Sequence, residues 1–194
     1  MSQPMSRAAF LSRGASGGIA LVAGGSLLAA TTGPAFASQP TDADIAKLAA
    51  TAELLAIDFY TKAIRSGFFK GDELRYLQRA RISERAHYKA LAGVLKSDTP
   101  SGLTFKYPLG SFGSRLKIAK TGVALETAFV GAYLGAVTAL QSNELKGVAA
   151  TIAASEASHL SVFSDIARHN PIIPSFPKSL TATEATNALT PFLS

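Results

Sequence analysis

The 194 residues of this sequence include no cysteine. This absence excludes disulfide bonds, zinc–thiolate sites and thiol catalysis, and it excludes a bacterial lipoprotein, whose lipid is attached to a cysteine. Charge is also scarce, because only 16% of the residues are charged. The net charge of +6 comes without a dense stripe of Lys and Arg, so we expect a solvated basic surface and no nucleic-acid partner. The 47% of hydrophobic residues are enough to build a core.

Residues 1–37 have the pattern of an export signal rather than of a folded element. Arg7 and Arg13 form a basic start that contains no acidic residue. Residues 17–28 form an apolar stretch that is too short and too rich in glycine for a membrane-spanning helix. The tripeptide Ala-Phe-Ala ending at Ala37 is typical of a cleavage site. We therefore expect cleavage after Ala37 and a mature chain without a transmembrane span.

The route of export is less defined than export itself. Residues 6–11 resemble a twin-arginine motif, but Ala8 stands where the second arginine belongs. The sequence thus leaves the twin-arginine and general routes open, with an uncleaved membrane anchor as the alternative. In either route the mature protein is expected in the periplasm, the cell wall or the medium.

Four long helices are predicted in the rest of the chain, and no strand pattern competes with them. Thr41 and Asp44 form a capping box at the start of the first helix. Gly67 suits the left-handed residue that follows the end of that helix, and Asp72 is the expected N-cap of the second. The predicted helices span residues 41–66, 72–96, 114–142 and 143–169.

The lengths of the joints predict how these helices pack. The joints at 67–71 and 142–143 are short, which favours two antiparallel hairpins. The loop between the second and third helices is long enough to run along a helix of about 40 Å. The expected fold is therefore all-α: two antiparallel hairpins joined by a long crossover form a four-helix bundle over residues 38–169.

A proline-rich tail, residues 170–194, follows the bundle. Its prolines prevent a continuation of the fourth helix. Thr181 and Glu184 are expected to cap a short helix that ends before Pro191. This tail could pack on the bundle or mediate a homodimer.

The third and fourth helices are unusually apolar. Residues 123–140 are apolar enough to suggest a membrane span, but they include Glu126, and a glutamate within such a stretch is better explained inside a bundle. Four glycines in these helices are expected to let helices approach closely: Gly122, Gly131, Gly135 and Gly147.

Carboxylates and imidazoles recur at a fixed spacing in the helices. The second and fourth helices each carry Glu-x-x-His, whose two side chains share one helix face, and the first and third each supply one glutamate. Residues equidistant from a hairpin turn lie at the same height, and this places all of them at one level. The set is Glu53, Glu84, His87, Glu126, Glu156 and His159.

The surroundings of these residues favour a metal site. Glu126 is the only charged residue between positions 121 and 143, and a lone buried carboxylate is costly unless it is paired. Each motif alone has a simpler explanation, since Glu-x-x-His is common on solvated helices and a single glutamate is usually a surface residue or an ion-pair partner. The joint pattern predicts a site for two metal ions.

With these motifs, residues 41–169 resemble the ferritin-like superfamily, and the whole mature chain is similar to exported ferritin-like proteins related to desiccation- and stress-associated proteins. The resemblance implies that Glu84 and Glu156 bridge two metal ions. It implies that Glu53 with His87 serves one ion and Glu126 with His159 the other. Ser83 and Ser155 stand where many di-iron bundles have an acid that orients the histidine.

Two tyrosines are candidates for supporting this site. Tyr60 follows Glu53 by seven positions and Tyr133 follows Glu126 by seven, so each returns to nearly the same helix face. Either could hydrogen-bond a ligand carboxylate or donate electrons, and the alternative is an ordinary core tyrosine. His169 lies at a helix end and is not counted as a ligand.

Oxygen and imidazole ligands without sulfur suit iron or manganese. The expected function is an exported di-iron protein that acts as a ferroxidase or consumes O2 or peroxide in stress protection. Two alternatives stay open: a protein in which the metal only staples the bundle, and an enzyme resembling manganese catalase. Storage of iron in a shell is less favoured, because no shell interface is evident.

Overall fold

The computed structural model describes residues 39–172 and 174–194, so the predicted export signal lies outside the described part. The described part is all-α, as predicted. Its only extended pairing is an isolated bridge between Phe105 and Leu193. The elements are α2 (Asp42–Arg65), α3 (Gly71–Leu95), η2 (Lys96–Asp98), α4 (Arg115–Ala139), α5 (Asn143–Ile166), α6 (Ala182–Leu189) and η3 (Thr190–Phe192).

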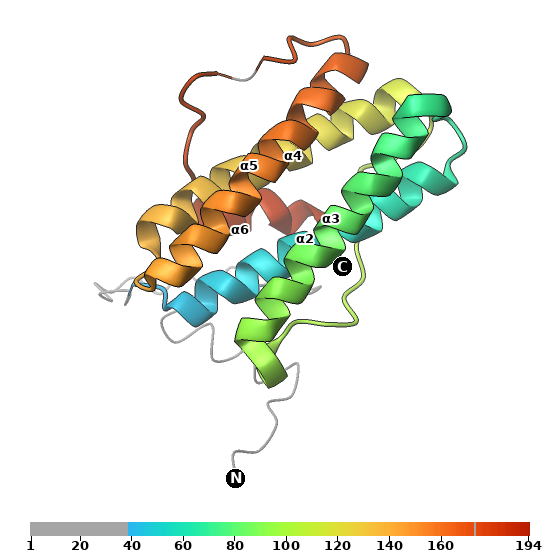
Figure 1. The fold of residues 1–194 in the computed structure, drawn as a ribbon. Coiled ribbons are helices and arrows are strands. Elements are labelled where there is room, and N and C mark those ends of the chain that lie inside the picture. Colours follow the sequence, from blue (N-terminus) through green and yellow to red (C-terminus); the bar gives the residue numbers. More distant parts are fainter. Residues whose placement is uncertain (1–38, 173) are drawn as a thin grey trace, which may run out of the picture.

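The four long helices pack as two hairpins, α2 with α3 and α4 with α5. The loop between α3 and α4 returns along the bundle, so α3 and α4 run in the same direction (Figure 1). The crossover is therefore present. It also makes α2 and α4 antiparallel, which matters for the site because both of these helices contribute a glutamate.

Local signals set most helix ends. The capping box of Thr41 and Asp44 is present, and so is that of Thr181 at the start of α6. Gly67 has a positive φ of 74° after the end of α2, a conformation that glycine adopts without steric cost. The prediction for α3 was wrong: Lys70 is its N-cap and makes no side-chain cap hydrogen bond, while Asp72 lies in the first turn.

The glycines of α4 serve two different neighbours. A Cβ on Gly122 would come within 2.6 Å of the Phe163 ring on α5, so this glycine does let two helices approach. Gly131 and Gly135 instead admit the tail: the Leu180 carbonyl oxygen would be 1.7 Å from a Cβ on Gly135. The Leu180 N–H donates to the Gly131 carbonyl oxygen at 2.8 Å. The expectation of close helix packing was therefore right for one of these three.

Gly147, the fourth glycine, does not support that expectation either, because nothing lies within 4 Å of a Cβ built there. The tail that docks on α4 continues into α6, which packs against α4 and α2. Beyond α6, the Lys106 N–H donates to the Phe192 carbonyl oxygen at 2.9 Å. The tail thus packs on the bundle and ties the crossover to it.

Among the described residues, α4 is the one helix long and apolar enough to cross a membrane by length and composition. Half of its most apolar 18-residue window is buried inside the protein. Leu125 and Phe129 are core residues in that window, and Glu126 is fully buried with them. In the structure α4 is thus a central helix of the bundle.

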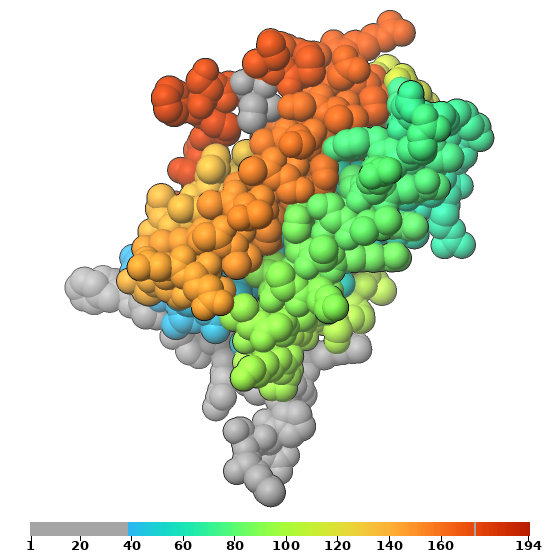
Figure 2. Space-filling view, in the orientation of Figure 1, coloured from blue at the N-terminus to red at the C-terminus, as the bar shows by residue number. Residues whose placement is uncertain are grey.

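On one face of the molecule α3 and α5 lie side by side and cover the helices behind them (Figure 2). The two helices touch through small side chains, with the hydroxyl oxygens of Ser83 and Ser155 3.3 Å apart. The residues expected to bind metal lie beneath this contact, between the two hairpins.

Candidate metal centre

All six residues of the predicted site meet in the interior of the bundle. The four glutamates are at most 2% exposed, and His159 is 5% exposed. His87 is the most accessible of them, with 14% of its side chain exposed. His169 is exposed and lies outside the cluster, three residues beyond the end of α5, which stops at Ile166 rather than at the predicted residue 169.

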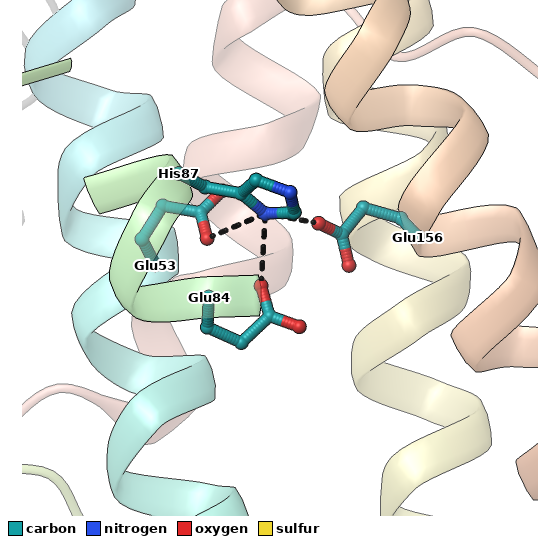
Figure 3. A group of neighbouring side chains, drawn as sticks. All are labelled: Glu53, Glu84, His87 and Glu156. Carbon is teal, nitrogen blue, oxygen red and sulfur yellow. Dashed lines mark hydrogen bonds and ion pairs between the residues drawn. The ribbon is translucent and has the colours of Figure 1, made fainter. Parts of the chain in front are cut away.

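One half of the cluster is centred on the His87 imidazole, which lies between three carboxylates (Figure 3). Its Nδ1 atom is 3.2 Å from Oε2 of Glu84, 3.2 Å from Oε1 of Glu156 and 3.4 Å from Oε2 of Glu53. The three carboxylates come from three helices, α3, α5 and α2. Two hairpins are therefore needed to complete this half.

The other half is centred on His159. Its Nδ1 atom is 2.8 Å from Oε1 of Glu84 and 3.2 Å from Oε2 of Glu156. Glu126 of α4 completes this half, so that Glu84, Glu126, Glu156 and His159 each offer a ligand atom within 4.8 Å of the others. The same holds for the four residues around His87. Glu84 and Glu156 belong to both groups.

The spacing of these atoms suits metal ions. With bonds of about 2.1 Å, neighbouring octahedral ligands are about 3.0 Å apart and opposite ones about 4.2 Å apart. The observed imidazole–carboxylate distances of 2.8–3.4 Å fall near the first value. By hydrogen-bond geometry, one buried oxygen of every glutamate has no donor: Glu53 Oε2, Glu84 Oε1, Glu126 Oε2 and Glu156 Oε1. A histidine Nδ1 lies within 3.4 Å of three of these oxygens, all except Glu126 Oε2. A buried cluster of carboxylate oxygens with so few donors fits two hard cations.

Two tyrosines form hydrogen bonds to Glu53 and Glu126, which we call the outer glutamates because each belongs to only one ligand group. Both bonds run between α2 and α4. The Tyr60 hydroxyl on α2 donates to Oε1 of Glu126 on α4 at 2.6 Å. The Tyr133 hydroxyl on α4 donates to Oε1 of Glu53 on α2. The same seven-residue spacing on two antiparallel helices produces this exchange. Each tyrosine thus orients a carboxylate on the opposite hairpin, and the second oxygen of that carboxylate stays available to bind a metal ion.

The electrostatics of the cluster reflect many carboxylates around few cations. Burial opposes a charge on His87, but Glu156, Glu53 and Glu84 outweigh it and raise its pKa to about 12. The pKa of His159 rises to about 10, because Glu156 and Glu84 likewise outweigh burial. Burial opposes ionisation of Glu84, yet hydrogen bonds from His159 and His87 lower its pKa to about 2. Both imidazoles therefore carry protons when protons are the only cations present.

Burial dominates at the outer glutamates. It raises the pKa of Glu53 well above the ordinary value, and the negative charges of Glu156 and Glu84 act in the same direction. The pKa of Glu126 is raised for the same two reasons. Metal binding would have to displace the protons held here and on the histidines.

The structure adds two contacts that the sequence pattern did not reveal. Ser83 Oγ lies 3.3 Å from Nε2 of His87. The serine hydroxyl thus contacts the histidine at the position where many di-iron bundles have an acid. Tyr76 on α3 packs edge-on against His159, with 6.0 Å between ring centroids. Tyr76 precedes Glu84 by eight positions, a spacing within one helix face, but its contact is with His159 on α5, which no spacing along α3 predicts.

The fold and the cluster agree with a comparison against protein families. The model of a family described as ferritin-like domain matches residues 41–169, about two thirds of the chain. The chain belongs to the ferritin-like family. Comparison with curated proteins gives no match. The family match covers all four helices of this ferritin-like protein, including every residue of the cluster.

Proposed function

We propose that this ferritin-like protein binds two metal ions in the six-residue cluster, iron by preference, and uses them to react with O2 or peroxide outside the cytoplasm. The observation that carries this proposal is the pair of overlapping ligand groups that share Glu84 and Glu156. Two adjacent cations that share carboxylates are suited to two-electron chemistry.

In this proposal the residues divide by position. Glu84 and Glu156 would bridge the ions, because both groups include them. Glu53 with His87 would complete one site, and Glu126 with His159 the other. Four carboxylates would balance two divalent cations and favour their oxidised form, and the absence of sulfur ligands suits iron or manganese.

The redox balance is simple. Two Fe(II) ions would each supply one electron, and O2 would take up two electrons and two protons to give hydrogen peroxide. With peroxide as the oxidant, two electrons and two protons would give two water molecules. The apolar core around the cluster excludes bulk water, while Tyr60 and Tyr133 fix the carboxylates of Glu126 and Glu53 during the change of charge.

Anaerobic titration with Fe(II), followed by exposure to air or peroxide, tests the proposal. The purified protein should bind two Fe(II) per chain and oxidise them rapidly, as followed by optical absorption. Glu126→Ala should abolish rapid oxidation, whereas Glu144→Ala, a change of an exposed glutamate in the first turn of α5, should not. A wild-type protein that binds no iron and oxidises none would refute the proposal.

The same experiment separates two other outcomes. Release of O2 from peroxide with Mn(II) but not with Fe(II) would identify a manganese enzyme. A protein whose melting temperature collapses on chelation, without turnover, would be metal-stapled only. Export, proposed from the pattern of residues 1–37, is tested by locating the protein after cell fractionation and by sequencing its mature N-terminus, which should begin at Ser38.

A further inference from the structure

The two halves of the cluster correspond to each other along the chain, and the correspondence breaks at one partly buried side chain, that of Tyr76. Ser83 and Ser155, which meet across α3 and α5, are 72 positions apart, as are the two Glu-x-x-His motifs. At the same shift, Tyr76 of α3 corresponds to Val148 of α5. The half around His159 therefore has a phenol where the half around His87 has an aliphatic side chain.

Tyr76 and Tyr60 flank the same imidazole. Their ring centroids lie 6.0 Å and 5.8 Å from that of His159, and both rings are edge-on. Val148 packs instead on the apolar cluster that contains Ile45 and Tyr133. The difference between the two halves is therefore chemical, because two phenol rings pack on His159, whereas the hydroxyl 3.3 Å from His87 Nε2 is that of Ser83.

The Tyr76 hydroxyl is buried and has no hydrogen-bond partner among the described residues. The Tyr60 hydroxyl, by comparison, already donates a hydrogen bond to Glu126. A buried hydroxyl without a partner is costly, so the free donor needs a partner that the side chains do not supply. A tyrosine hydroxyl carries its hydrogen at neutral pH and can therefore act as a donor.

We propose that Tyr76 is a positioning residue that donates a hydrogen bond to a small oxygen ligand, such as hydrogen peroxide, at the His159 end of the cluster. This inference rests on the proposed function, since it needs an occupied metal site. Val148 has no donor, so the ligand is directed to one end of the cluster and the two ions become inequivalent.

The variant Tyr76→Phe tests this role, with azide as the probe for a small anionic ligand. Iron(III)-loaded wild-type and variant proteins are titrated with azide and followed by visible absorption. Loss of one hydrogen bond to a charged acceptor should weaken azide binding roughly tenfold. The KM for peroxide should rise more than kcat falls. Iron stoichiometry should stay the same, because Tyr76 belongs to neither ligand group.

Tyr107→Phe is the matched control. The Tyr107 hydroxyl donates to Asp58 at 2.9 Å, away from the cluster, so its removal should lower stability and leave azide binding unchanged. Tyr76→Phe should keep or raise the melting temperature, because it removes an unpaired donor. Unchanged azide affinity in Tyr76→Phe, or loss of iron from that variant, overturns this role alone. Failure of the wild-type protein to bind iron overturns the proposed function.

Discussion

Tyr60 on α2 donates a 2.6 Å hydrogen bond to Glu126 on α4, a residue 66 positions further along the chain. The bond joins the first hairpin to the second through a residue of the cluster. Tyr133 returns the same interaction to Glu53. Both bonds are buried and run between α2 and α4. Hairpin docking and site geometry are thus coupled.

This coupling predicts a double effect of removing one hydroxyl. Tyr60→Phe leaves a buried Glu126 oxygen without its donor, which should cost about 1–3 kcal/mol of unfolding free energy. Loss of a partner that orients a ligand should also weaken metal binding about 10- to 100-fold. Urea denaturation and Mn(II) titration measure the two effects. Equal metal affinity in Tyr60→Phe and Tyr107→Phe would contradict the role of Tyr60.

Shared and unshared glutamates should behave differently when substituted. Glu84 belongs to both ligand groups, so Glu84→Gln should weaken the binding of both metal ions. Glu53 belongs to one group only, so Glu53→Gln should leave about one ion per chain. Anaerobic Mn(II) binding followed by metal analysis measures the stoichiometry. Glu144→Gln, on the exposed first turn of α5, is the control that should keep wild-type binding.

If Glu53→Gln and Glu84→Gln lost the same number of ions, the division into two sites would be incorrect.

The sequence predicted the helices well because their signals are local. Capping boxes at Thr41 and Thr181 act within four residues, and an antiparallel hairpin with a short joint leaves little freedom in register. Matched heights then followed from distance to each turn. For this reason Glu53 and His87 could be placed together although they lie on different helices.

What the sequence could not supply are contacts between segments that no short turn relates. The position of Tyr76 against His159 depends on how α3 packs on α5. Docking of Leu180 on Gly131 depends on the path of the tail. The glycines were visible in the sequence, but their spacing does not distinguish a neighbouring helix from an extended segment.

The pKa shifts predict how metal binding depends on pH. The raised pKa values of His87 and His159, about 12 and 10, stabilise the metal-free fold fully below the unfolded value near 6.5. That stability is lost as pH rises through the folded values. Metal ions need unprotonated imidazoles, so their affinity should increase with pH.

Addition of Mn(II) should therefore raise the melting temperature more at pH 8.5 than at pH 6, and binding in weak buffer should release protons. Differential scanning fluorimetry and an indicator dye measure the two effects. His169→Ala, at an exposed position outside the cluster, should leave both unchanged. A stabilisation that does not vary between these pH values would contradict the assignment of the histidines as ligands.

Docking of the tail predicts opposite effects at two glycines. Gly135→Ala places a Cβ 1.7 Å from the Leu180 carbonyl oxygen, a backbone atom, so the tail has to move away from α4. The melting temperature should fall, and limited proteolysis should cleave the tail faster than in the wild-type protein. In Gly147→Ala nothing lies within 4 Å of the new Cβ, so better helix propensity should stabilise the protein by about 0.5–1 kcal/mol. Equal protease resistance of the tail in both variants would mean that Gly135 is not what admits it.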